Sequence, residues 1–142
     1  IEYTGYEISS QAYQICKSKE NQKLKFKLKD ITKEKNDYSD LLLIIDVLEH
    51  VEDYFLFLKK IRPLARYKIF HIPLDMTVKN ILIKNTFKEK RRLVGHIHYF
   101  SKETVLETLK DCQYQIIDYF FTDSSLSLPP LIFSLCCSLN IF

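Results

Sequence analysis

The sequence has 142 residues, of which 46% are hydrophobic and 27% are charged. This length suits one domain with a substantial core, and the composition excludes both a disordered chain and a bundle of membrane helices. The 21 basic residues only slightly exceed the 18 acidic ones and are spread along the chain, so the charge balance does not indicate a nucleic-acid-binding protein.

The cysteines and the first residues indicate the cellular compartment and how the chain begins. Cys16, Cys112, Cys136 and Cys137 show neither the CxxC spacing of structural zinc sites nor the density of a disulfide framework. We therefore expect a reducing, cytoplasmic compartment. The sequence begins without Met, without a basic region and without the apolar stretch of a signal peptide, which predicts a chain truncated at its N-terminus.

Strands and helices alternate in the first part of the chain. Bulky residues alternate over residues 3–8, and Ser9 can then begin a helix, which predicts a strand followed by a helix. Residues 24–28 alternate Leu or Phe with Lys, as in a half-buried strand near a sheet edge. Residues 41–45 are continuously apolar, which predicts a strand buried on both faces at the centre of a parallel sheet.

The alternation continues in the second part. Apolar residues recur at helical spacing over 54–61, and residues 67–72 predict another strand. A basic helix is expected over 77–93, Ser101 can begin a further helix, and residues 114–121 form an apolar, aromatic strand. This order predicts an α/β fold whose mostly parallel sheet is covered by helices on both faces.

The C-terminal residues do not continue this pattern. Pro129 and Pro130 interrupt an apolar tail, and the run after them has about a dozen residues, fewer than the ~17 that span a bilayer. We expect no membrane association. The predicted division is an α/β domain over residues 1–122 and an apolar tail over 123–142 that forms an incomplete edge.

Acidic residues follow three successive predicted strands. In open α/β sheets the ligand crevice lies beyond the carboxyl ends of the strands, where Glu7, Asp30 and Asp46 are expected. A carboxylate at Glu7 can accept hydrogen bonds from both hydroxyls of a ribose, and Asp30 can accept one from an adenine amino group. Each acid is equally compatible with a solvated strand end or the start of a turn.

Several segments in this order resemble one family. The sequence Asp46-Val47-Leu48-Glu49-His50-Val51 resembles the motif after the fourth strand of class I S-adenosylmethionine-dependent methyltransferases. Residues 5–12 resemble the family's second strand and helix start, and residues 70–73 and 95–109 resemble its fifth strand and the segment of its last helix. The resemblance implies S-adenosylmethionine as cofactor. It implies cofactor contacts by Glu7, Ile8, Asp30, Ile31, Asp46 and Val47.

Two departures from the family pattern stand out. Gly5 and Gly95 are the only glycines, so the family's glycine-rich cofactor loop is not among these residues. The antiparallel strand that closes the family's sheet is not evident in the tail, and Gln113 stands where the family usually has glycine. We therefore expect a Rossmann-like class I methyltransferase sheet without its first strand and without that loop.

The candidate catalytic residues are Glu49 and His50. A histidine that titrates near neutral pH can take a proton from a hydroxyl or amine acceptor during methyl transfer. The alternative is that His50 only packs its loop onto the sheet. Histidines 71, 96 and 98 have no carboxylate or cysteine at ligand spacing in the sequence, so no metal site is predicted.

The sequence is compatible with three functions. The first is S-adenosylmethionine-dependent methyl transfer to an acceptor that the sequence does not identify, with a small molecule as the expected partner. The second is a non-catalytic fragment or binding module of the same fold, which the missing glycine-rich loop favours. The third is a nicotinamide-dependent enzyme, whose ribose also meets an acid after the second strand, and a hydride-transfer assay would distinguish it.

Overall fold

The computed structural model describes residues 1–34, 37–123 and 131–139. The chain forms two compact units, Ile1–Asp37 and Tyr38–Phe142, and each is described by itself. The division falls after Asp37. The sequence had predicted a boundary after residue 122 instead. Residues 131–139 belong to the second unit.

The first unit is a parallel strand pair with one helix. Strand β1 (Tyr3–Glu7) pairs in parallel with β2 (Leu24–Leu28), and Gly5 lies opposite Phe26 in this register. Helix α1 (Ser10–Lys17) begins where the sequence predicted, because the Ser9 side chain accepts a hydrogen bond from the backbone of Ala12. A short 3-10 turn, η1 (Ile31–Lys33), follows β2.

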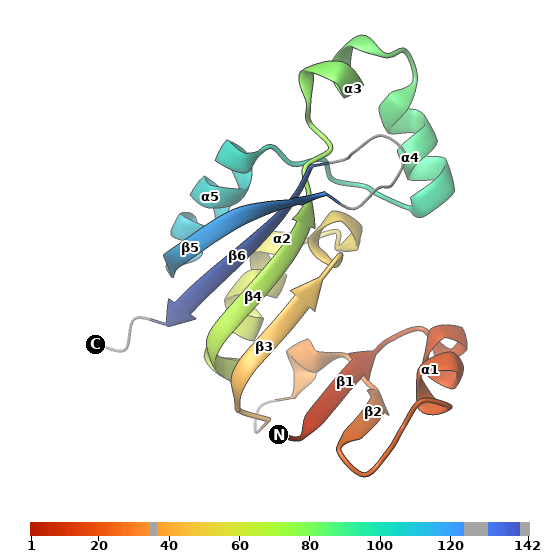
Figure 1. Ribbon diagram of the computed structural model, residues 1–142, viewed down its shortest axis with the longest axis vertical. Helices are drawn as coiled ribbons and strands as arrows, with labels where there is room; N and C mark the ends of the chain where they lie inside the picture. Colours follow the sequence, from red (N-terminus) through yellow and green to blue (C-terminus); the bar gives the residue numbers. More distant parts are fainter. Residues whose placement is uncertain (35–36, 124–130, 140–142) are drawn as a thin grey trace. The chain divides into compact units, whose positions relative to one another are not determined.

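The second unit contains a four-stranded sheet. The strands β3 (Ser39–Ile45), β4 (Ala65–Pro73), β5 (Tyr114–Asp123) and β6 (Leu131–Leu139) lie in the order β3-β4-β6-β5 (Figure 1). β3 and β4 are parallel, whereas β6 runs antiparallel to both of its neighbours. The antiparallel strand that was not evident from the sequence is therefore β6, which lies inside the sheet.

Two helices cover one face of this sheet. Helix α2 (Tyr54–Ile61) and helix α5 (Lys102–Asp111) both lie behind the strands in Figure 1. α2 begins at Asp53, whose carboxylate accepts a hydrogen bond from the backbone of Leu56, and α5 begins with a capping box at Ser101. The core between helices and strands includes Ile44, Leu58, Ile61, Phe70, Ile72, Val105, Leu109 and Tyr114.

The position of β3 corrects one prediction. Within its unit β3 lies at the end of the strand order, so the apolar run is not central in this four-stranded sheet. Ile44 faces the core and is 4% exposed, whereas Leu41, Leu43 and Ile45 point the other way and are 45%, 51% and 56% exposed. Side chains alternate across a strand, and α2 and α5 cover only one of its faces, so within the second unit the run is buried on one side alone.

The basic segment between β4 and α5 forms two helices where one was predicted. Helix α3 (Val78–Leu82) and helix α4 (Thr86–Val94) are separated at Asn85, which has a left-handed backbone with φ of 66°. α4 ends at Gly95, also left-handed with φ of 77°. Among the helices that the structure describes, none is long and apolar enough to cross a membrane.

Candidate functional site

Two of the predicted cofactor acids lie at the same edge of the first unit. Because β1 and β2 are parallel, their carboxyl ends meet there, and the backbone N–H of Lys29 donates to the carbonyl of Glu7. A surface hollow of about 380 Å³ at this edge is lined by Ile8, Leu28, Lys29, Asp30 and Lys33. The structure thus brings Ile8 and Asp30, both predicted from the sequence, to one concave surface.

The same two acids also begin the segments that follow them. Glu7 Oε1 accepts a hydrogen bond of 2.7 Å from the backbone N–H of Ser9. Asp30 Oδ1 accepts from the backbone N–H of Thr32 at 2.9 Å and from its hydroxyl at 2.8 Å, just before Ile31 starts η1. A carboxylate has about four lone-pair sites, so the bond from Ser9 leaves capacity on Glu7 for ligand hydroxyl groups, while Oδ2 of Asp30 lies 3.7 Å from Nζ of Lys33.

Asp46 joins the carboxyl ends of β3 and β4 in the second unit. Its Oδ1 lies 2.8 Å from Nδ1 of His71, and its backbone N–H donates to the carbonyl of His71 at 3.0 Å. The backbone of Asp46 is left-handed with φ of 50°, which turns the chain sharply out of β3. Val47 follows and leads into the 3-10 turn η2 (Leu48–His50), which the buried Leu48 anchors.

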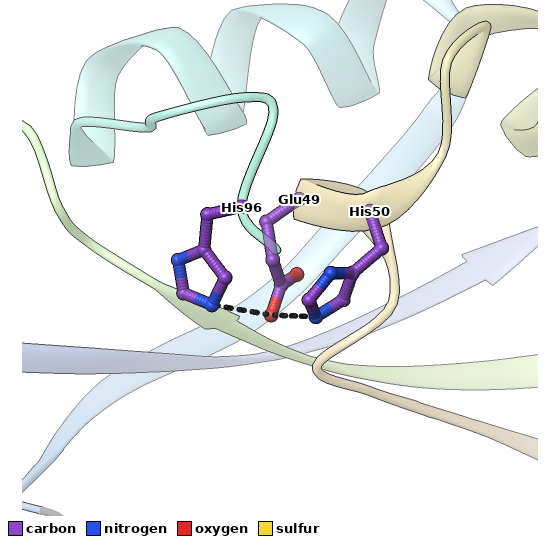
Figure 2. Close-up of side chains that lie close together, drawn as sticks. All are labelled: Glu49, His50 and His96. Atoms are coloured by element: carbon purple, nitrogen blue, oxygen red, sulfur yellow. Dashed lines mark ion pairs between the residues drawn. The ribbon is translucent and has the colours of Figure 1, made fainter. Parts of the chain in front are cut away.

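Glu49 occupies the centre of a small cluster of ionisable side chains. It is fully buried, and its carbonyl accepts hydrogen bonds from the backbone N–H groups of Ile97 and His98 at 2.8 and 3.2 Å. These bonds hold residues 96–98 against η2. In Figure 2 the Glu49 carboxylate lies between two imidazoles, with Oε1 3.8 Å from Nε2 of His50 and 3.9 Å from Nε2 of His96.

Burial governs the protonation of Glu49. Desolvation raises the pKa of its carboxyl to about 7, and the negative charges of Asp46 and Asp75 add to the rise. The backbone N–H of Glu49 and the nearby His96 offset only part of this effect. Among the described residues, no side chain donates a hydrogen bond to either carboxylate oxygen. A negative charge on Glu49 is therefore poorly compensated by the protein alone.

Both imidazoles are held by their Nδ1 atoms. Nδ1 of His50 lies 3.1 Å from the carbonyl oxygen of Gly95, and Nδ1 of His96 lies 2.6 Å from Oδ2 of Asp75. Asp75 is buried and forms an ion pair of 2.8 Å with Nζ of Lys90. The two rings are fixed edge to face, with centroids 5.1 Å apart.

Sequence reasoning found part of this cluster. It selected Glu49 and His50 as neighbours after β3, but it did not connect them with His96 and did not name Asp75. In the sequence, Asp75 lies in the segment after β4 and His96 in the segment after α4. Both are far from Glu49 along the chain, so no spacing rule connects them with it. The other two histidines lie elsewhere, since His71 contacts Asp46 and Nε2 of His98 lies 3.2 Å from the carbonyl of Glu52.

The cluster permits two kinds of chemistry. An imidazole nitrogen that carries a lone pair can accept a proton from a nucleophile, as predicted for His50. Alternatively, one carboxylate oxygen and two imidazole nitrogens can bind a divalent cation, and suitable atoms of Glu49, His50 and His96 all lie within 4.8 Å of one another. Either role places reactive groups beyond the carboxyl end of β3.

Comparison with known proteins identifies the fold. No protein-family model and no curated protein matches the sequence. A solved S-adenosylmethionine-dependent methyltransferase from Methanosarcina mazei is 13% identical with a TM-score of 0.73, the match covering 98% of this chain and 82% of that one. The N-methyltransferase NodS from Bradyrhizobium japonicum, in complex with S-adenosyl-L-homocysteine, is 14% identical with a TM-score of 0.71, covering 99% and 67%.

A third structure extends the likeness. Magnesium protoporphyrin IX methyltransferase from Synechocystis, with bound S-adenosylhomocysteine, is 18% identical with a TM-score of 0.66, the match covering 96% of this chain and 63% of that one. At these identities the likeness concerns the arrangement of the backbone, and it agrees with the order of strands and motifs predicted from the sequence. The chain therefore has the fold of the class I S-adenosylmethionine-dependent methyltransferases.

Proposed function

We propose that this protein binds S-adenosylmethionine and transfers its methyl group to an oxygen or nitrogen atom of a small-molecule acceptor. One observation carries the proposal: acids end two adjacent parallel strands beside a hollow, in a fold shared with solved S-adenosylmethionine-dependent methyltransferases. Fold alone does not define a reaction, so the reaction is inferred from the side chains at the strand ends.

In this proposal the first unit binds the adenosine part of the cofactor. The carboxylate of Glu7 accepts hydrogen bonds from the ribose hydroxyls, and Asp30 accepts one from the adenine amino group. Ile8 lines the hollow with an apolar side chain that is 78% exposed, so a flat base packed on it would remove this surface from water. Ile31, Asp46 and Val47 stay proposed cofactor contacts.

The second unit would supply the groups near the acceptor. When bound, S-adenosylmethionine supplies a methyl carbon on a positively charged sulfur, and transfer breaks that C–S bond while the acceptor's lone pair forms the new bond. The protein's task is to align the acceptor and take its proton. Nδ1 of His50 faces the Gly95 carbonyl, which leaves Nε2 as the atom that can receive the proton, next to Glu49.

A second candidate function is a non-catalytic binding module. The observation that favours it is the presence of only two glycines, since close backbone approach to the amino acid part of the cofactor normally needs glycine. Such a module would bind an adenosine-containing ligand without transferring a methyl group. Incubation with S-adenosylmethionine and mass spectrometry of candidate acceptors would distinguish the two functions.

Calorimetric titration with S-adenosylhomocysteine tests the proposal. Glu7→Gln preserves an acceptor for the Ser9 N–H but removes the charge and one lone-pair-rich oxygen, so we expect at least tenfold weaker binding than by the wild type. Glu2→Gln is the matched control, because Glu2 is exposed near the start of the same strand and should bind as the wild type does. Circular dichroism establishes that each variant is folded.

Two outcomes would contradict the proposal. A folded wild-type chain that shows no saturable binding would remove the cofactor from consideration. Equal affinities for the wild type, Glu7→Gln and Glu2→Gln would show that the ligand binds elsewhere and that Glu7 only accepts the hydrogen bond from the Ser9 N–H.

A further inference from the structure

We propose that Glu49, His50 and His96 form a binding site for a divalent transition-metal cation of the zinc type. The three residues come from η2 and from the segment after α4, and their side chains converge in Figure 2. All three belong to the second unit, whereas the proposed adenosine contacts Glu7 and Asp30 belong to the first. The inference goes beyond methyl transfer and would stand without it.

The hydrogen bonds around the cluster leave three electron-pair donors facing one another. A carbonyl or carboxylate oxygen can only accept, so each imidazole must donate through Nδ1, His50 to Gly95 and His96 to Asp75. In the neutral rings Nε2 then carries a lone pair. Both Nε2 atoms point at the Glu49 carboxylate, which also offers only lone pairs when ionised. A cation is the partner that satisfies all three.

The distances suit such a cation after a side-chain adjustment. Two ligand atoms about 2.1 Å from one zinc ion lie roughly 3.4 Å apart in tetrahedral geometry. Oε1 of Glu49 is 3.8 and 3.9 Å from the two Nε2 atoms, and the three ligand atoms all lie within 4.8 Å of one another. Binding one ion would therefore bring each pair closer, by up to about 1.4 Å. Two histidines and one glutamate occupy three positions and leave a fourth for water or a ligand, as in catalytic zinc sites.

The surroundings of the cluster resemble the outer shell of a metal site. Histidine ligands usually donate their second ring nitrogen to a carboxylate or backbone carbonyl, which fixes the ring and raises its basicity. His96 has a carboxylate in this position and His50 has a carbonyl. Glu49 is buried with side-chain exposure of 1%, and a cation would compensate the charge that the protein leaves uncompensated.

The cation would also define the acceptor. At its fourth coordination position the cation would bind an oxygen or nitrogen of a ligand and would lower the pKa of a bound hydroxyl, so His50 would act as a metal ligand instead of a free base. This step rests on the proposed methyl transfer, whereas the cation site does not. The acceptor class is then a molecule with a hydroxyl group that can bind the metal at its one open position.

Cobalt titration tests the site directly. Metal-free protein is titrated with Co²⁺ while the visible absorption of the bound ion is recorded, and Zn²⁺ is then added to displace it. We expect one Co²⁺ per chain with nitrogen and oxygen ligands, and at least 100-fold weaker binding by His96→Asn and by Glu49→Gln. His98→Asn is the matched control and should bind within twofold of the wild type, because His98 faces Glu52 and not the cluster.

The outcomes separate this inference from the proposed function. Equal Co²⁺ affinity in the wild type, His96→Asn and Glu49→Gln, all shown to be folded by circular dichroism, would overturn the site. A folded wild type without saturable Co²⁺ or Zn²⁺ binding would also overturn it. Metal binding that is lost in both variants supports the site even when the same protein does not bind S-adenosylhomocysteine, a result that would count only against methyl transfer.

Discussion

Nδ1 of His96 lies 2.6 Å from Oδ2 of Asp75, and the other oxygen of Asp75 lies 2.8 Å from Nζ of Lys90. Both carboxylate oxygens are thereby engaged, although the Asp75 side chain is almost fully buried. The ion pair with Lys90 holds the carboxylate in place, and the carboxylate holds the imidazole. Asp75 is therefore a positioning residue that aims Nε2 of His96 at Glu49.

We predict that Asp75→Asn weakens Co²⁺ binding by about 10-fold to 100-fold, the range typical for outer-shell partners of metal ligands. The asparagine can still accept from Nδ1 of His96, but it removes the negative charge beside the ring. The dissociation constant from the cobalt titration is the measurement. Asp40→Asn, at an exposed residue of β3, is the control, and equal affinities of the two variants would contradict the positioning role.

The protonation of Glu49 gives the protein a pH-dependent stability. Its pKa in the folded chain is about 7, well above the ordinary value of 4.5. Between these pH values the folded state holds a proton that the unfolded state has released. The contribution of this proton is complete below pH 4.5 and is lost as the pH rises through 7.

Glu49→Gln should remove this dependence. We predict that, without metal, the unfolding free energy of the wild type falls by about 2 to 3 kcal/mol more than that of the variant between pH 5 and pH 8, because about 2 pH units of the shift lie in this range at 1.36 kcal/mol each. Urea unfolding in the presence of a chelator at several pH values measures the difference. Parallel pH profiles for the two proteins would show that Glu49 ionises freely in the fold.

The sequence predicted features that depend on neighbouring residues and missed those that depend on distant ones. Ser9 and Ser101 begin helices because a side-chain oxygen meets a backbone N–H a few residues later. The pairing of Glu49 with His96 instead requires η2 and the segment after α4 to meet in space. The burial of residues 41–45 was overestimated, because apolar character does not reveal how many faces of a strand are covered.

Gly5 is required by its neighbour across the strand pair. A Cβ atom at this position would lie 2.4 and 2.5 Å from Cδ1 and Cε1 of Phe26. We predict that Gly5→Ala destabilises the protein by about 1 to 3 kcal/mol, the usual cost of overpacking. Phe26→Leu should reduce this penalty in the double variant, and chemical unfolding of all four proteins measures the coupling. Strictly additive effects would contradict the proposed clash.

The same backbone conformation occurs at a glycine and at a glutamine, and this predicts opposite effects of substitution. Gly95 ends α4 with φ of 77°, and Gln113 follows α5 with φ of 63°. A left-handed backbone costs residues other than glycine roughly 1 kcal/mol. Gln113→Gly should therefore stabilise the protein by about 0.5 to 1 kcal/mol, and Gly95→Ala should destabilise it by about 1 kcal/mol.

The contacts around each position separate the effect of the backbone from the effect of the side chain. A Cβ at Gly95 would lie 3.6 Å from Nδ1 of His50, which is ordinary contact, so the backbone accounts for the expected loss. At position 113 the side chain accepts a hydrogen bond from Arg62 at the surface, which Gln113→Gly and Gln113→Ala both remove, while Gln113→Ala alone keeps the left-handed backbone strained. Thermal unfolding should thus rank Gln113→Gly above both the wild type and Gln113→Ala. An alanine variant as stable as the glycine variant would show that the backbone at this position is not strained.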